Sequence, residues 1–84
     1  MSERGLGAFV LVVTRVGTEH KVKEKIERLA GEMEGDVWVD AKPVFGEYDL
    51  VVTVEARDLR ALDKLVSGIR GLDEVVKTVT LIAV

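Results

Sequence analysis

The stretch that decides the fold is Val37–Ala56, VWVDAKPVFGEYDLVVTVEA. Every second residue of Leu50–Ala56 is apolar, which predicts a strand, and Val37–Phe45 predicts another strand before it. Between them Gly46-Glu47 can turn the chain, so the two strands form a hairpin. Because Pro43 cannot donate a hydrogen bond to a sheet, its strand is predicted to lie at an edge.

N-terminal to the hairpin, the sequence predicts one strand and one helix. Ala8–Thr14 is a short apolar run bounded by glycines, which favours a strand that is covered on both faces. Apolar residues then recur at helical spacing from Val22 to Met33, with Thr18 in place to act as the N-cap. This half therefore contributes a strand and an amphipathic helix.

C-terminal to the hairpin, a second helix and a last strand are predicted. Asp58 is the expected N-cap of a helix that ends at Gly71, and Val75–Val84 follows as a strand. The order β-α-β-β-α-β joins two βαβ units and predicts an α+β, ferredoxin-like fold. Right-handed crossovers put both helices on one face of a four-stranded antiparallel sheet with strand order 4-1-3-2.

The helix-free face of this sheet is predicted to be an interface. In the central strands, Ala8–Thr14 and Leu50–Ala56, both alternating sets of side chains are largely apolar. Which set of the first strand faces the helices, Phe9, Leu11 and Val13 or Val10 and Val12, stays open. Since large exposed apolar patches usually mark interfaces, we predict a homodimer paired through this face of the sheet.

Composition excludes several classes of protein. The 84 residues fit one domain, and the 15 acidic and 12 basic residues give a net charge of −3 without a basic cluster, which argues against direct DNA binding. There is no cysteine and the only histidine is His20, so we expect no zinc site, no catalytic residues, no cofactor and no enzyme activity. The absence of Asn and Gln beside 32% charged residues is typical of thermophile proteins.

The sequence shows no export or membrane signal. Residues 1–5 include an acid where a signal peptide carries bases, and no apolar stretch approaches the roughly 20 residues that span a bilayer. We therefore expect a cytoplasmic protein that does not enter a membrane.

The candidate ligand site consists of a turn and a strand. In the turn, Gly46 and Glu47 can present backbone N–H groups to an anion, Asp49 can hold an ammonium group, and Tyr48 can shape a pocket. In the last strand, Thr78 and Thr80 are two apart, so their hydroxyls share one face. An ordinary turn with ordinary strand threonines is the alternative that the residue types leave open.

Residues 39–52, VDAKPVFGEYDLVV, together with Ala8–Val12 and Thr78–Ile82, resemble the Lrp/AsnC ligand-binding domain, also called the RAM domain (regulation of amino-acid metabolism). The resemblance covers roughly residues 7–84. It implies a ferredoxin-like domain that dimerises through its sheets and assembles into octamers or decamers. It also implies that a free amino acid binds between dimers, near the residues matching Gly46–Asp49, Thr78 and Thr80.

The resemblance also shapes the expected domain organisation and role. Full-length members carry an N-terminal helix-turn-helix, whereas about seven residues precede the first strand here. Residues 1–84 are therefore expected to be a single RAM domain that regulates transcription by assembling with full-length Lrp/AsnC-type proteins. The sequence departs from the family at Asp73-Glu74-Val75, where Gly-Val is common, which affects the local loop shape.

Three alternatives remain. The same architecture occurs in small dimeric α+β barrel enzymes such as monooxygenases, against which the lack of a catalytic histidine or cofactor motif argues. It also occurs in ACT-type regulatory domains, which are usually fused to an enzyme. A ligand-free structural assembly is the third alternative.

Overall fold

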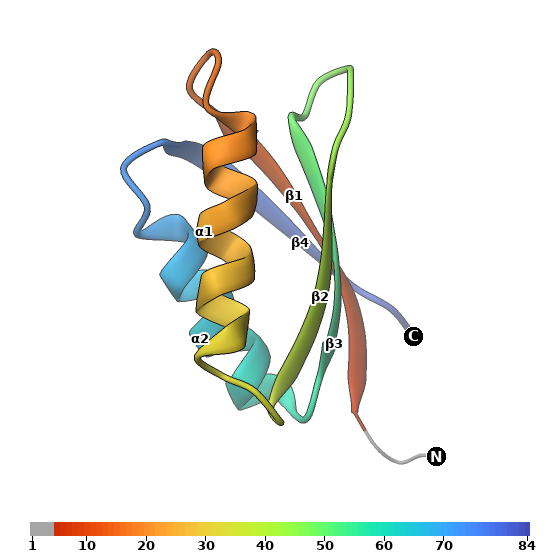
Figure 1. Cartoon of the computed structure of the whole chain (residues 1–84). Coiled ribbons are helices and arrows are strands. Elements are labelled where there is room, and N and C mark those ends of the chain that lie inside the picture. Colours follow the sequence, from red (N-terminus) through yellow and green to blue (C-terminus); the bar gives the residue numbers. More distant parts are fainter. Residues whose placement is uncertain (1–4) are drawn as a thin grey trace.

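The chain has the element order β-α-β-β-α-β that the sequence predicts (Figure 1). The computed structural model describes residues 5–84, so most of the N-terminal stretch used to argue against a signal peptide lies outside it. The elements are β1 (Leu6–Thr14), α1 (Glu19–Gly31), β2 (Val37–Pro43), β3 (Leu50–Ala56), α2 (Leu59–Arg70) and β4 (Val75–Ile82). Within the described part, neither helix is long and apolar enough to cross a membrane.

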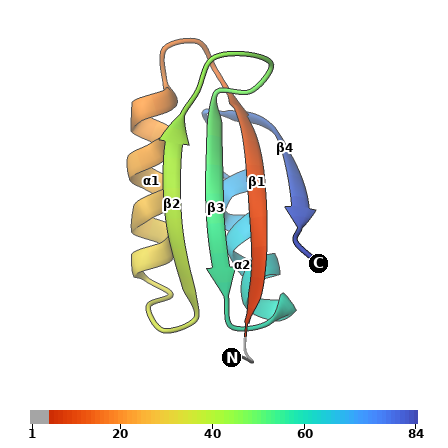
Figure 2. The same cartoon turned by 90° about the vertical axis from the view of Figure 1, so that its right-hand side faces the viewer.

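The four strands form one antiparallel sheet in the order β2-β3-β1-β4, which is the predicted order counted from the other edge. Both helices cover the same face and leave the other face open (Figure 2). Pro43 ends the edge strand β2, where its missing N–H costs no ladder hydrogen bond. The predicted ferredoxin-like fold is therefore confirmed.

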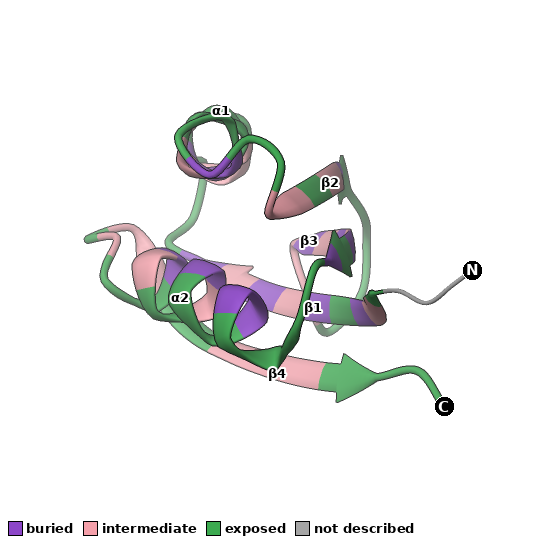
Figure 3. Cartoon of the chain, turned by 90° about the horizontal axis from the view of Figure 1, so that it is seen from below, coloured by how far each residue is buried: buried purple, intermediate pink, exposed green. Residues whose placement is uncertain are grey.

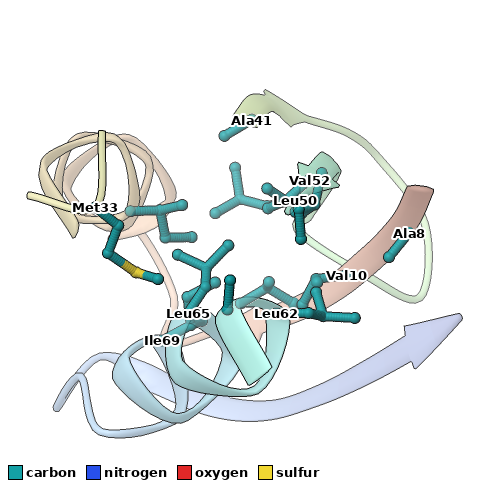
Figure 4. Close-up of a cluster of buried hydrophobic side chains, with 14 of the residues drawn as sticks. Ala8, Val10, Met33, Ala41, Leu50, Val52, Leu62, Leu65 and Ile69 are labelled. Carbon is teal, nitrogen blue, oxygen red and sulfur yellow. The ribbon is translucent and has the colours of Figure 1, made fainter. Parts of the chain in front are cut away.

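The register settles which side chains of β1 face the helices. Val10 and Val12 are completely buried against them, and Val10 lies opposite Val52 of β3. The buried residues of α1 and α2 lie on the sides of the helices that face the sheet (Figure 3). The side chains of Leu62, Leu65 and Ile69 on α2 point into this layer (Figure 4). A continuous core of aliphatic side chains thus fills the space between the sheet and the two helices, while β4 has no buried residue.

Several local predictions need correction. β2 ends at Pro43, so Val44 and Phe45 belong to the connection to β3 instead of the strand. Thr18 occupies the N-cap position of α1, but its hydroxyl donates to the carbonyl of Arg15 (2.7 Å) and does not cap the helix. In α2, by contrast, the Asp58 carboxylate accepts a hydrogen bond from the N–H of Ala61 (2.9 Å), as predicted.

The loop before β4 is fastened to the first half of the chain through Glu74. Its carbonyl accepts a hydrogen bond from the N–H of Arg15 (2.8 Å), and its carboxylate oxygens lie 2.9 and 3.0 Å from Lys25 Nζ on α1. The hydrogen bond from Lys25, assisted by the backbone N–H of Glu74 itself, lowers the pKa of the Glu74 carboxyl. These contacts join the start of β4 to both β1 and α1.

The Glu74 contacts predict a stability loss in acid. Because the folded-state pKa of Glu74 lies below its unfolded value, the pair contributes stability above the unfolded pKa, about 4.3. This contribution disappears as the pH falls through the folded pKa. Glu74→Gln should therefore be less stable than the natural protein near pH 6 and lose less stability on acidification to about pH 3. Urea unfolding at both pH values checks this, and an equal loss in the two proteins would contradict it.

Candidate functional site

The connection between β2 and β3 is pinned to β1 by Asp49. The N–H of Asp49 donates to the carbonyl of Val12 (2.8 Å), and its carboxylate Oδ2 accepts from the N–H of Thr14 (2.8 Å). The base of the loop is closed by a hydrogen bond from the N–H of Val44 to the carbonyl of Asp49 (3.0 Å). One carboxylate oxygen of Asp49 therefore has a structural role, and Oδ1 has no partner among residues 5–84.

The outer part of this loop offers unused backbone donors. Gly46 has a φ of +133°, a conformation that L side chains rarely adopt, although a Cβ there would meet nothing within 4 Å. In the described part of the chain, no hydrogen bond uses the N–H of Gly46 or Glu47. Glu47 is exposed and Tyr48 is half-buried. The glycine is thus required by the backbone, and the donors predicted to receive an anion are available.

Thr14 is a polar residue beside the turn that the sequence analysis did not single out. It is only 6% exposed, and its hydroxyl has no hydrogen-bond partner within residues 5–84. Because Thr14 stands at the end of an apolar strand, its type and position look ordinary. Only the structure, in which the Thr14 hydroxyl is buried without a hydrogen-bond partner, identifies this residue as unusual.

Replacing Thr14 by valine is expected to raise the free energy of unfolding by about 1–2 kcal/mol. Valine has nearly the same shape, and the substitution removes a buried hydroxyl that forms no hydrogen bond in the chain. The N–H of residue 14 still reaches Asp49. Thr14→Ser, which keeps the hydroxyl and loses the methyl group, is the matched control and should be destabilised. A Thr14→Val protein that unfolds at lower urea concentration would show that the hydroxyl is paired in solution.

Thr78 and Thr80 share one face of β4, as predicted, and this face is the one that the helices cover. Thr78 lies opposite Val12 and Thr80 opposite Val10. Both threonines line a groove between α2 and β4 of about 590 Å³, together with Val66, Arg70 and residues 75–77. We call this hollow the α2–β4 groove.

A single chain does not bring the two halves of the candidate site together. Val12 contacts Asp49 on one side and pairs with Thr78 on the other, so β1 separates the turn from the threonines. Two strand spacings amount to about 10 Å, more than the length of a small amino acid's charged backbone group. A small amino acid held by the turn is therefore too short to reach the threonines of the same chain.

The open face of the sheet carries a mainly apolar centre. Side chains of β1, β3 and β4 provide it, and charged residues stand around it on β2, β3 and β4. Phe9 and Leu81 are opposite one another and are 43% and 51% exposed. The apolar members are Phe9, Leu11, Val13, Val51, Val79 and Leu81, with Trp38 at the edge.

A metal site has no support in residues 5–84, where no three histidine, cysteine, aspartate or glutamate side chains lie together in a way that could hold an ion. His20 lies exposed on the first turn of α1. The polar groups that remain, backbone N–H donors, one carboxylate oxygen and threonine hydroxyls, are suited to binding a small charged molecule.

The arrangement defines a small ferredoxin-like domain with an apolar open face and a polar hairpin turn. A family model described as the Lrp/AsnC ligand binding domain matches residues 7–84. The chain therefore belongs to the Lrp/AsnC ligand-binding-domain family, as the resemblance of residues 39–52 indicated. No curated protein is similar enough to count as a relative.

Solved structures agree with this assignment. FFRP-DM1 is 39% identical with a TM-score of 0.76, and the match covers 94% of this chain and 99% of that one. TTHA0845 from Thermus thermophilus is 34% identical with a TM-score of 0.77, covering 94% and 92%. The feast or famine regulatory protein Rv3291c from M. tuberculosis, solved in complex with L-methionine, is 27% identical with a TM-score of 0.59. That match covers 93% of this chain and 49% of Rv3291c, so the chain spans about half of that protein.

Proposed function

We propose that the chain is a regulatory module that binds a free amino acid and has no catalytic activity. The observation that carries the proposal is the turn Gly46–Asp49, which combines unused N–H donors with a carboxylate oxygen that has no partner in the described part of the chain. The donors would hold the carboxylate of an amino acid, and Asp49 Oδ1 would hold its ammonium group. The L-methionine complex of Rv3291c supports this ligand class.

The proposed module works as an assembly. Two copies pair through the open face, which buries the apolar centre around Leu11 and Val51. Because Thr78 and Thr80 lie across β1 from the turn, their hydroxyls would contact a ligand held by the turn of a neighbouring dimer. A ligand at such a contact stabilises the assembly in which it binds.

The proposed target is a full-length Lrp/AsnC-type regulator, with which the chain would form mixed assemblies. Direct DNA binding is not part of the proposal, because the net charge is −3 and the acidic and basic residues are interspersed. The module would thus report an amino-acid level through its partner, in the cytoplasm.

A thermal-shift screen with the twenty amino acids tests the ligand class. At a concentration about 100 times its dissociation constant, a ligand adds about 2.7 kcal/mol to the stability of the folded state. For a domain of this size the midpoint should then rise by about 10 °C or more. The screen needs a moderate urea concentration if the protein melts near boiling. If no amino acid raises the midpoint at millimolar concentration, the proposal is wrong and a ligand-free assembly remains.

A further inference from the structure

A groove of about 260 Å³ lies between the end of α1 and the start of α2, away from the candidate amino-acid site. Its walls carry three cationic side chains, Arg57 just before α2 and Arg60 and Lys64 on α2. Met33, which follows α1, lines the groove from the other side and is 9% exposed. We call this hollow the basic groove. It combines a cationic wall with the apolar side chain of a methionine.

The positive charge of the basic groove is only partly compensated. Two carboxylates line it, and both are engaged: Asp36 Oδ1 accepts a hydrogen bond from Arg57 Nη1 (3.2 Å), and Asp58 caps α2. Arg60 and Lys64 make no ion pair within residues 5–84. Because they lie four residues apart on one helix, their like charges disfavour that helix. A chain with a net charge of −3 thus keeps a local excess of positive charge here.

This combination of side chains suits a phosphate ester with a flat ring. A phosphate monoester carries between about 1.5 and 2 negative charges near pH 7 and three acceptor oxygens, so it can serve several cations at once. Guanidinium groups bind phosphate through two parallel hydrogen bonds. Arg57 is oriented by Asp36 and retains further N–H donors. The thioether of Met33 is a soft apolar surface on which an aromatic ring packs well.

We propose that the basic groove binds a nucleoside phosphate as a second ligand of the domain. Arg60 and Lys64 hold the phosphate group, Arg57 adds a third contact, and the base packs on Met33. A free phosphate ion would satisfy the cations and leave Met33 uncovered, which is why the proposal commits to an ester that carries a ring. The proposal goes beyond amino-acid binding and does not rest on it.

The basic groove is separate from the turn Gly46–Asp49. The turn precedes β3 and Arg57 follows it, so the seven residues of this strand lie between them. At about 3.3 Å per residue the separation is about 23 Å. Figure 1 shows the two connections at opposite ends of the sheet. The groove also lies on the side of the helices, so pairing through the open face leaves it accessible.

Isothermal calorimetry at low ionic strength, without any amino acid, tests the ligand class. AMP, GMP, CMP and UMP are titrated in turn, with adenosine and inorganic phosphate as the two halves of the ligand. We expect a nucleotide to bind at least tenfold more tightly than inorganic phosphate, and adenosine to give no heat.

Substitutions on α2 locate the phosphate contact. We expect Arg60→Gln and Lys64→Gln each to weaken nucleotide binding by about tenfold or more, which corresponds to one lost hydrogen bond to a charged group. Both side chains are exposed, so the fold should be retained. Arg70→Gln is the matched control, because it removes a positive charge from the other end of the same helix, in the α2–β4 groove. It should bind the nucleotide like the natural protein.

Nuclear magnetic resonance of ¹³C-labelled methionine methyl groups gives an independent readout. The chain has only two methionines, Met1 and Met33, and Met33→Leu identifies the Met33 signal. We expect the nucleotide to shift this signal through the ring current of its base, with the same half-saturation concentration as the calorimetric titration. Inorganic phosphate should leave it almost unchanged.

The proposal is overturned if no nucleotide gives heat or shifts the Met33 signal at millimolar concentration. It is also wrong if inorganic phosphate or adenosine binds as tightly as the nucleotide, or if Arg70→Gln loses as much affinity as Arg60→Gln. Those results would mean a general attraction to positive charge instead of a defined groove. Since the measurements contain no amino acid and alter none of residues 46–49, failure of the amino-acid screen leaves their outcome unaffected.

Discussion

Replacing Val51 by lysine is expected to convert the protein into a monomer of 9.2 kDa. Val51 lies at the centre of the open face, opposite Leu11 on one side and Lys42 on the other. In a dimer paired through this face, the new ammonium group would be buried with no carboxylate directly across from it. Such an uncompensated charge costs several kcal/mol, about 3 or more, and a symmetric dimer contains two.

The expected weakening is at least about 100-fold per lysine, since 1.4 kcal/mol corresponds to a factor of ten. Light scattering over a micromolar concentration range measures it, and circular dichroism verifies that the fold persists, because the lysine of a monomer lies in water. Ser67→Lys adds the same charge on the exposed side of α2 and should keep the natural oligomeric state. A Val51→Lys protein that remains a dimer would show that the copies pair through another surface.

Removing the charge of Asp49 is expected to weaken amino-acid binding by about 10- to 100-fold, the equivalent of the 1.5–3 kcal/mol of a hydrogen bond to a charged group. Asp49→Asn is the informative variant because its amide oxygen can still accept the hydrogen bond from the N–H of Thr14. The fold should therefore be retained while the ammonium group of the ligand loses its partner. Isothermal calorimetry with the amino acid identified in the screen measures the change.

Asp49→Ala is a less informative variant than Asp49→Asn, because the Asp49 carboxylate also holds the loop in place. It removes the acceptor that satisfies the N–H of Thr14, and leaving such a donor unpaired costs about 1–3 kcal/mol of stability. Loss of binding in this variant could come from a displaced loop. Asp63→Asn, an exposed charge removal on α2, serves as the control and should bind normally. If Asp49→Asn binds like the natural protein, the proposed ammonium contact is wrong.

The fold was predictable because its signals are local and agree with one another. Pro43 marks an edge strand, Asp58 begins α2, and the apolar run Ala8–Thr14 marks a central strand. Which side chains of β1 face the helices was not predictable, because Phe9 and Val10 are both apolar. It is decided by packing against helices that lie far away in the sequence.

The candidate site was predictable only in its parts. The turn and the paired threonines show in the residue types, but their separation by β1 depends on the register of three strands. The structural use of Asp49 and the buried hydroxyl of Thr14 depend on one contact between residues far apart in sequence, the hydrogen bond from Thr14 to Asp49. Such contacts leave no pattern along the chain.

The strand order has a consequence for how the protein is made. β1 pairs only with β3 and β4, and β2 pairs only with β3, so residues 6–43 contain no strand–strand hydrogen bonds among themselves. While the ribosome synthesises this half, the apolar run of β1 has no strand to pair with and is exposed to aggregation. The sheet can form only after β3 has emerged from the ribosome. The second edge of β1 stays unpaired until β4 has emerged as well. The domain must therefore fold as one unit after most of it has left the exit tunnel, at a rate limited by closing these long loops.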